Sequence, residues 1–220
     1  MLNDSTDLLP NLEPEPRWPV IIGIAATAGL YLAIPERLTP GPNWLLGMVV
    51  GILLIPTVIA HRMGRARLNY IFGFSIVAIL TGALIWSLGT LIAGLPTKSE
   101  SPAELLRAAV ALWACNVLVF AVWYWRLDAG GPHQRDQHRF HTDGAFLFPQ
   151  MTLPVNSKLA KKQWRPGFVD YLFLAFNTST AFSPTDVPVL SRWAKGLMMV
   201  QSSISLGTLA ILAARAINIL

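Results

Sequence analysis

The sequence predicts an all-α fold: a polytopic membrane helical bundle with five full transmembrane helices and one short segment that is broken or re-entrant. Two observations lead to this prediction. The first is composition, because 53% of the 220 residues are apolar and only 13% are charged, with a mean hydropathy of +0.48; these values lie outside the range of an ordinary soluble domain. The second is that the apolar residues form long uncharged runs of the ~17–25 residues needed to cross a ~30 Å hydrocarbon layer.

Five such runs occur, and none contains a charged residue: 19–35, 42–60, 70–95, 108–125 and 196–214. A buried helix of a large soluble protein can resemble one of them, but five would leave too little polar sequence to cover their surfaces. The single cysteine, Cys115, lies in the fourth run, where we expect it to pack among helices. The chain then divides into a disordered acidic N-terminal tail (1–17), four transmembrane helices (18–126), a basic loop (127–167) and a pore-like half-helix with the last transmembrane helix (168–220).

The distribution of positive charge predicts on which side of the membrane each loop lies. If all five runs span, the loop 61–69 and the loop 126–167 lie on the same face, and they hold most of the Lys and Arg residues. The positive-inside rule then predicts that both loops and the N-terminus are cytoplasmic, in the cell membrane of a bacterium. We expect the basic loops to meet the anionic headgroups of the lipid bilayer and not nucleic acid, since they adjoin apolar spans and no nucleic-acid module surrounds them.

The last run carries a polar stripe, since Gln201, Ser205 and Thr208 follow the i, i+4, i+7 spacing of one helix face. A polar side chain in hydrocarbon needs a partner, so this stripe either packs against other helices or lines a wet cavity. Helix packing is the favoured interpretation, because hydroxyl residues commonly mediate contacts between membrane helices. Asn116 in the fourth run is expected to bond this stripe or a neighbouring backbone carbonyl.

The segment 168–188 does not fit a full span. Its apolar part, 168–176, is too short to cross, and 177–186 is polar with Pro184 inside it. Non-helical backbone at membrane depth is tolerated only where protein shelters it or where it lines a cavity, so this segment is a candidate functional site. Asp170 and Asp186 could equally serve as helix caps or loop acceptors.

The residues from Thr178 to Asp186, followed by Pro188, Arg192 and Lys195, resemble the pore helix, filter and following helix of two-helix potassium channels. Phe182, Ser183, Pro184 and Thr185 replace the glycine-containing potassium signature, so potassium selectivity by that mechanism is not expected. A longer stretch is similar to an uncharacterised family of bacterial multi-pass membrane proteins that shares this channel-like tail. That similarity is carried, in order, by Ala121–Trp125, Gly130–Pro132, Phe146–Gln150, Asp170–Leu172 and Ala181–Asp186.

The resemblance implies a fold and no activity. Potassium channel filters are entered from outside, whereas the charge pattern starts this segment in the cytoplasm. The segment therefore either crosses as a short broken sixth helix or re-enters from inside. The sixth crossing is slightly favoured, because Arg215 would then obey the charge rule.

Three functions are compatible with these patterns. In a channel-like protein, which would need a homo-oligomer such as a tetramer, oxygens would face an ion from Thr178, Ser179, Thr180, Ser183, Thr185 and Asp186. A membrane metal-binding protein would use His133, His138 and His141, whose spacing differs from a H-E-x-x-H zinc helix. The third alternative is a structural or partner-binding subunit. The sequence has no nucleotide-binding loop, nucleophile elbow or paired intramembrane carboxylates, so we expect no enzymatic activity and no cofactor.

Overall fold

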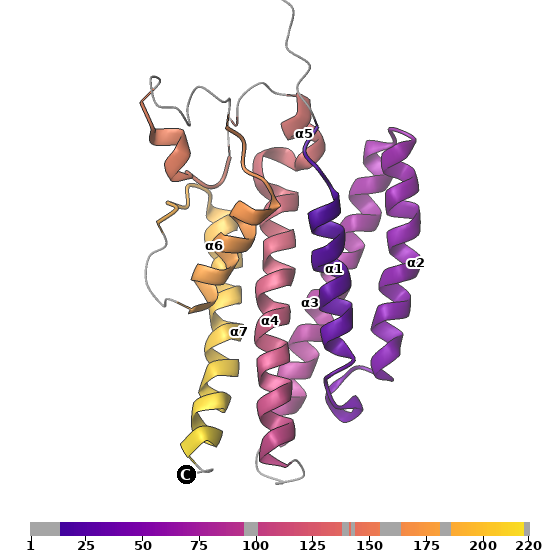
Figure 1. The fold of residues 1–220 in the computed structure, drawn as a ribbon, viewed down its shortest axis with the longest axis vertical. Coiled ribbons are helices and arrows are strands. Elements are labelled where there is room, and N and C mark those ends of the chain that lie inside the picture. Colours follow the sequence, from indigo (N-terminus) through magenta and orange to yellow (C-terminus); the bar gives the residue numbers. More distant parts are fainter. Residues whose placement is uncertain are drawn as a thin grey trace, which may run out of the picture.

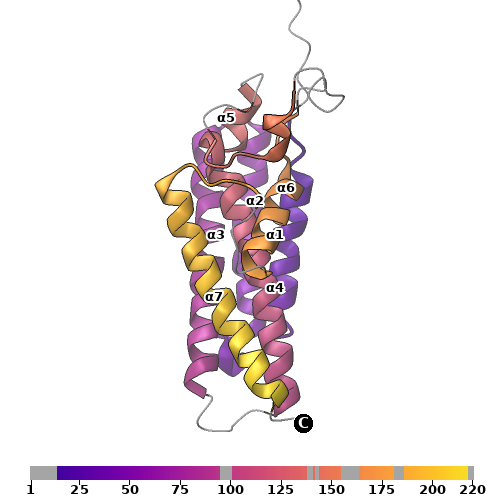
Figure 2. The same cartoon turned by 90° about the vertical axis from the view of Figure 1, so that its left-hand side faces the viewer.

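The computed structural model describes residues 14–94, 101–137, 141, 144–154, 164–180 and 186–217, and it is an elongated bundle of helices (Figures 1 and 2). Its α-helices are α1 (Trp18–Tyr31), α2 (Asn43–Arg62), α3 (Ala66–Gly94), α4 (Pro102–Leu127), α5 (Pro132–Gln137), α6 (Phe168–Thr180) and α7 (Arg192–Ile217). Short 3₁₀ turns lie at Glu36–Leu38, Asp128–Gly130 and Pro149–Thr152.

Four of these helices, α2, α3, α4 and α7, are long and apolar enough to cross a membrane. The predicted all-helical membrane fold is therefore confirmed in outline, but the count of five full spans is not. Helix α1 has 14 residues, which at 1.5 Å per residue extend only ~21 Å. Its start is fixed by Pro19 in the first turn, and it ends before the 3₁₀ turn that leads into α2.

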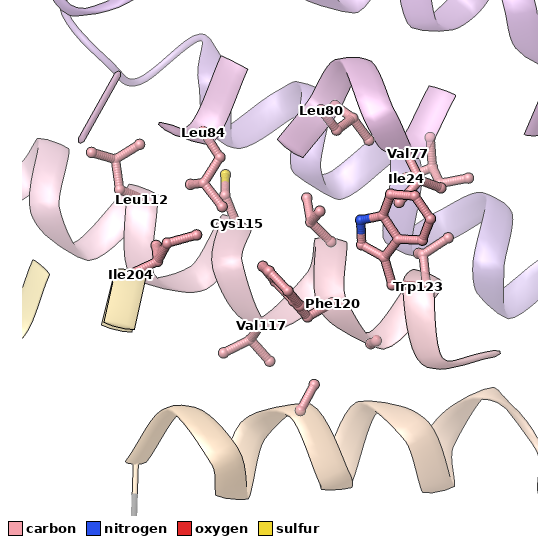
Figure 3. Close-up of a cluster of buried hydrophobic side chains, with 14 of the residues drawn as sticks. Ile24, Val77, Leu80, Leu84, Leu112, Cys115, Val117, Phe120, Trp123 and Ile204 are labelled. Carbon is pink, nitrogen blue, oxygen red and sulfur yellow. The ribbon is translucent and has the colours of Figure 1, made fainter. Parts of the chain in front are cut away.

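Helix α4 is the centre of the bundle and packs against α1, α3, α6 and α7. A capping box starts it, because Ser101 Oγ accepts from the backbone N–H of Glu104 at 3.3 Å and Glu104 Oε2 accepts from the backbone N–H of Ser101 at 3.0 Å. Figure 3 shows apolar side chains of neighbouring helices around its middle, among them Ile24 of α1, Leu84 of α3 and Ile204 of α7. Cys115 is fully buried in this core, as expected of a packing residue.

Helix α6 is re-entrant. It starts near the ends of α4 and α7, runs into the bundle, and stops at Thr180 (Figure 1). The chain then returns to the end from which α6 started, because Val189 forms an antiparallel bridge with Phe146 and Leu190 N–H donates to Ala145 O at 2.8 Å. The Phe146 ring lies 6.3 Å from that of Tyr171 in the first turn of α6. The slightly favoured sixth crossing is therefore wrong, since the short segment enters and leaves at one end.

The loops with most of the positive charge lie together, as the charge pattern predicts. A single pocket is lined by Arg17 before α1, His61 at the end of α2, Arg126 at the end of α4 and His133 on α5. Helix α7 begins at this end of the bundle and runs to the opposite end, where the label for the C-terminus lies in Figure 1. That the basic end is cytoplasmic stays a prediction.

Candidate functional site

The first predicted site, the pore-like segment, is built into helix packing. Thr178 and Ser179 are buried, and Thr178 Oγ1 donates to Leu174 O of its own helix at 2.8 Å. Ser179 Oγ accepts from Gln201 Nε2 at 2.8 Å. Thr180 is exposed and bonds back to Phe176 O at 2.9 Å. The side-chain oxygens of this last turn therefore already have partners within the protein.

Two further members of that segment, Ser183 and Thr185, lie outside the described residues, and Asp186 is exposed. At the other end of α6, Asp170 Oδ2 accepts from Gly167 N–H at 2.8 Å, which is the bond of a helix N-terminal cap. Of the two aspartates that could be caps, the structure therefore shows this role for Asp170.

The polar stripe of α7 faces the end of α6. Gln201, Ser205 and Thr208 are all fully buried. Gln201 Nε2 donates to Ala175 O at 2.7 Å, and Ser205 Oγ donates to Ser179 O at 2.6 Å. Ser179 is one of the last four residues of α6, whose carbonyl groups lack intrahelical partners, and Ala175 lies about one turn earlier. Thr208 Oγ1 donates to carbonyls of α7 itself. Gln201 and Ser205 are therefore the members of the stripe that bond to another helix.

Helix α4 completes this network with Asn116 and Tyr124. Asn116 Nδ2 donates to Gln201 O at 3.1 Å, and Tyr124 OH donates to Gln201 Oε1. Asn116 Oδ1 is buried without a hydrogen-bond partner in the described structure. The amide of Gln201 thus connects α4, α6 and α7, which explains why a long polar side chain sits in the middle of an apolar helix.

A second polar cluster lies at the basic end, where α4 stops. The chain reverses through a tight turn in which Ala129, Gly130 and Gly131 have φ values of +49°, +74° and +89°. Gly131 is needed here, because a Cβ would lie 2.6 Å from Arg126 O and L side chains rarely adopt its φ. This turn brings the following helix α5 back over the end of α4.

Arg135 of α5 uses that position to cap α4. Its Nη1 donates to Trp125 O at 2.7 Å and to Asp128 O at 2.9 Å. Its Nη2 donates to Glu15 Oε2 at 2.9 Å, and both side chains are largely buried. A guanidinium is suited to this task, since its fork of donors satisfies carbonyls and a carboxylate at once.

The N-terminal segment before α1 is held by the same cluster. Arg17 pairs with the Asp136 carboxylate, and Trp125 Nε1 donates to Glu15 Oε1. The Arg17 guanidinium also lies 5.4 Å from the centre of the Trp125 ring. Burial lowers the pKa of Arg17, and the nearby Asp136 and Glu15 carboxylates act in the opposite direction. Residues 15 and 17, which the sequence assigned to an acidic tail, therefore contact α4 and α5.

Asp128 is the most buried carboxylate of the cluster, with no exposed surface. Its Oδ1 accepts from Ala145 N–H at 2.5 Å, and its Oδ2 accepts from Tyr171 OH at 2.7 Å. His141 Nε2 lies 3.1 Å from the same Oδ2. Parts of the chain that are separated in the sequence therefore converge on the carboxylate at the end of α4: His141, Ala145 and the first turn of α6.

His141 is the most distinctive side chain of this site. Its imidazole is 2% exposed, yet neither ring nitrogen makes a hydrogen bond of good geometry with the described residues. Gly144 provides its space, because a Cβ there would overlap Nε2 and lie 3.2 Å from Asp128 Oδ1. Buried polar atoms normally have partners, so a buried imidazole with an unpartnered Nδ1 needs an explanation such as an ion or a reacting group.

The other two histidines of the predicted metal set are not seen beside it. His133 is exposed on α5, with Nε2 3.3 Å from Gln137 Nε2. It lines the pocket that Arg17, His61 and Arg126 also line. His138 lies outside the described residues. Within the part of the chain that the structure describes, no group of three or more His, Cys, Asp or Glu residues is arranged to hold a metal ion.

Comparison with known proteins gives one informative similarity. No family model and no solved structure matches the chain. Over 109 residues, 48% of the chain, it is 29% identical to "Putative zinc metalloprotease sll0528" of Synechocystis sp.. The match spans only 27% of the length of that protein.

This similarity contradicts the expectation that the protein is not an enzyme. That expectation depended on missing local motifs, such as H-E-x-x-H, which does not occur in the 220 residues. Missing motifs do not exclude a site assembled from distant segments, and Asp128, His141 and Tyr171 show that the fold brings such segments together. A channel receives no support from the comparison.

The described residues fit part of a zinc site. Metal-bound histidine commonly directs its second ring nitrogen at a carboxylate, which fixes the ring and increases its basicity. His141 Nε2 lies 3.1 Å from Asp128 Oδ2, which is the distance but not the angle of such a bond, and Nδ1 is left as the atom for a metal. A catalytic zinc site usually has three protein ligands, so further ligands would be needed beyond His141.

Proposed function

We propose that this protein is a membrane enzyme of the hydrolytic, metal-dependent class, with His141 as a metal ligand and Asp128 as the residue that positions it. The observation that carries the proposal is the buried His141 imidazole, with Nε2 3.1 Å from Asp128 Oδ2 and Nδ1 without a partner. The similarity to a protein named as a zinc metalloprotease supports the same class. A bound zinc ion would polarise a carbonyl group and lower the pKa of a water molecule.

The residues around His141 are suited to holding it still. The Asp128 carboxylate is itself fixed by Ala145 N–H and Tyr171 OH, so it cannot rotate away from the imidazole without losing two hydrogen bonds. Gly144 allows the close approach. Mutation of such supporting groups typically lowers metal affinity or activity by about 10–100-fold. Asp128 and Tyr171 are therefore positioning residues in this proposal.

The experiment is a metal analysis of the full-length protein, purified in detergent and dialysed after loading with zinc. We expect about one zinc ion per chain, a strong loss in His141→Ala and an intermediate loss in Asp128→Asn. His61→Ala is the matched control, because His61 is an exposed histidine at the same end of the bundle. His133→Ala tests whether that residue belongs to the ligand set.

The proposal fails if the wild-type protein retains no zinc, or if His141→Ala retains as much as His61→Ala. Circular dichroism and size-exclusion profiles identify variants that do not fold. A structural or partner-binding subunit, the remaining alternative from the sequence, would then be the better interpretation. Neither zinc result depends on whether the protein conducts ions.

The channel hypothesis loses part of its basis. Thr178 and Ser179, two of its ion-facing residues, have their oxygens bonded within the bundle. Gln201 of the polar stripe is fully buried between helices, and its amide nitrogen bonds to Ala175 and Ser179 of α6. Liposome flux that disappears with Asp186→Asn or Thr180→Val would restore the hypothesis.

A further inference from the structure

A second site, distinct from His141, is a pocket of about 230 Å³ at the basic end of the bundle. It lies where α1, α2, α3, α4 and α5 meet. Its inner walls are apolar and include Val20 and Ile24 of α1 and Leu54 and Val58 of α2. Its cationic or titratable side chains are Arg17, His61, Arg126 and His133, and its neutral polar side chains include Thr57 and Asn69.

Arg126 is the unusual member of this pocket. Its side chain lies at the end of α4, and the residue is only 7% exposed. Among the described residues no carboxylate lies within ion-pair distance of it, and its Nε is buried without a hydrogen-bond partner. Its guanidinium packs against Gly73 of α3, and the guanidinium carbon lies 6.0 Å from the centre of the Trp125 ring. A buried charge without a counterion is costly, so an anion bound here would relieve an existing penalty.

The neighbouring basic residue makes a clear contrast. Arg17 also lines the pocket, but it is paired with Asp136 and Glu15. Arg126 instead extends across α3, where Gly73 leaves room for its guanidinium, since a Cβ at Gly73 would overlap that group. In the part of the chain that the structure describes, the fold therefore provides space for this cation without placing a carboxylate beside it.

We propose that this pocket binds the phosphate headgroup of an anionic phospholipid, with the Arg126 guanidinium on the phosphate and an acyl chain along the apolar wall between α1 and α2. A guanidinium pairs with phosphate through parallel hydrogen bonds. The apolar walls favour a lipid over free phosphate, because they would gain nothing from a small polar anion. Basic pockets between transmembrane helices are known to bind anionic lipid headgroups. The exposed side chains of Trp18 and Ile59 flank the same end and suit the bilayer interface.

The test uses the full-length protein in detergent, first stripped of lipid, then titrated with phosphatidylglycerol, phosphatidylcholine or inorganic phosphate. Native mass spectrometry counts bound molecules, and thermal unfolding reports stabilisation. We expect one tightly held phosphatidylglycerol, weaker phosphatidylcholine and no stabilisation by phosphate. Arg126→Gln should lower the affinity for phosphatidylglycerol about tenfold or more, the loss expected when charge-assisted hydrogen bonds are removed.

Two further variants make the result specific. Arg62→Gln changes the same charge at an exposed position that does not line the pocket, so its affinity should match that of the wild type. Val58→Phe should reduce lipid binding by filling the pocket with no change of charge. Without lipid, Arg126→Gln should melt no lower than the wild type, because it removes an uncompensated buried cation.

Equal losses in Arg62→Gln and Arg126→Gln would overturn the proposal in favour of general charge attraction. Stabilisation by inorganic phosphate equal to that by phosphatidylglycerol would overturn the lipid assignment. Unchanged lipid binding in both Arg126→Gln and Val58→Phe would show that the pocket is not the site. None of these outcomes bears on zinc retention at His141.

Discussion

Gln201 is the best single test of how the re-entrant helix α6 is held, and we predict that Gln201→Leu destabilises the fold by ~2–4 kcal/mol. The change keeps the size of the side chain and removes its donors to Ala175 O and Ser179 Oγ, which lie at 2.7 and 2.8 Å. Hydrogen bonds between membrane helices average ~0.6 kcal/mol, so these two contribute about 1 kcal/mol. The rest comes from Tyr124 OH, whose acceptor is lost and whose burial without a partner costs ~1–3 kcal/mol.

The assay is reversible unfolding in mixed micelles, with Ser203→Leu as the control. Ser203 lies on α7 two residues away but is exposed, and its hydroxyl bonds only to its own helix. Ser203→Leu should therefore change the free energy of unfolding little. In the Gln201→Leu background, Tyr124→Phe should recover part of the loss by removing the stranded hydroxyl. If Gln201→Leu is no more destabilising than Ser203→Leu, the network does not hold α6 as described.

Three other predictions test the topology and the two clusters. Cysteines introduced at Asp186 and at Glu104, in a background without the native cysteine, should react with an impermeant maleimide from opposite sides of the membrane; labelling from one side would refute the re-entrant path. Glu15→Gln should destabilise the fold measurably, by ~1–3 kcal/mol in micelle unfolding, because it weakens a largely buried pair with an arginine; an unchanged stability would show that the N-terminal contact is incidental. Gly144→Ala should lower zinc retention, because the added methyl group would displace the His141 imidazole. Full zinc retention in this variant would show that metal binding does not depend on the position of that imidazole.

Sequence patterns predict the class of this fold well because lipid imposes a strong constraint. Long uncharged runs are expected to form helices in a bilayer, and the structure has helices in all five of the predicted places. They predict helix length less well. The run 19–35 is long enough by composition, but α1 ends at Tyr31, before Pro35 and the 3₁₀ turn that follows it.

The candidate site was predictable only in part. The i, i+4, i+7 stripe on α7 correctly indicates one face, but its partner is the end of a helix some 25 residues earlier, which periodicity cannot identify. The Asp128 cluster was missed for a related reason. Asp128 follows a long apolar run and precedes Gly130-Gly131-Pro132, a signal for a buried helix end, whereas Tyr171 and Glu15 reach it only through the tertiary fold.

The half-helix and the polar stripe are two parts of one structural arrangement. A helix that stops inside a membrane leaves carbonyl groups without donors, and exposure to lipid would make each of them costly. Donors on α7 reach that end through Gln201 and Ser205, while the start of α6 is tied to Asp128 through Tyr171. Helix α6 is thus fixed at both ends, and the Asp128 carboxylate gains a rigid partner on its far side. This rigidity would let a single carboxylate orient the buried His141 imidazole at the bundle's basic end, which is the geometry that the metal proposal requires.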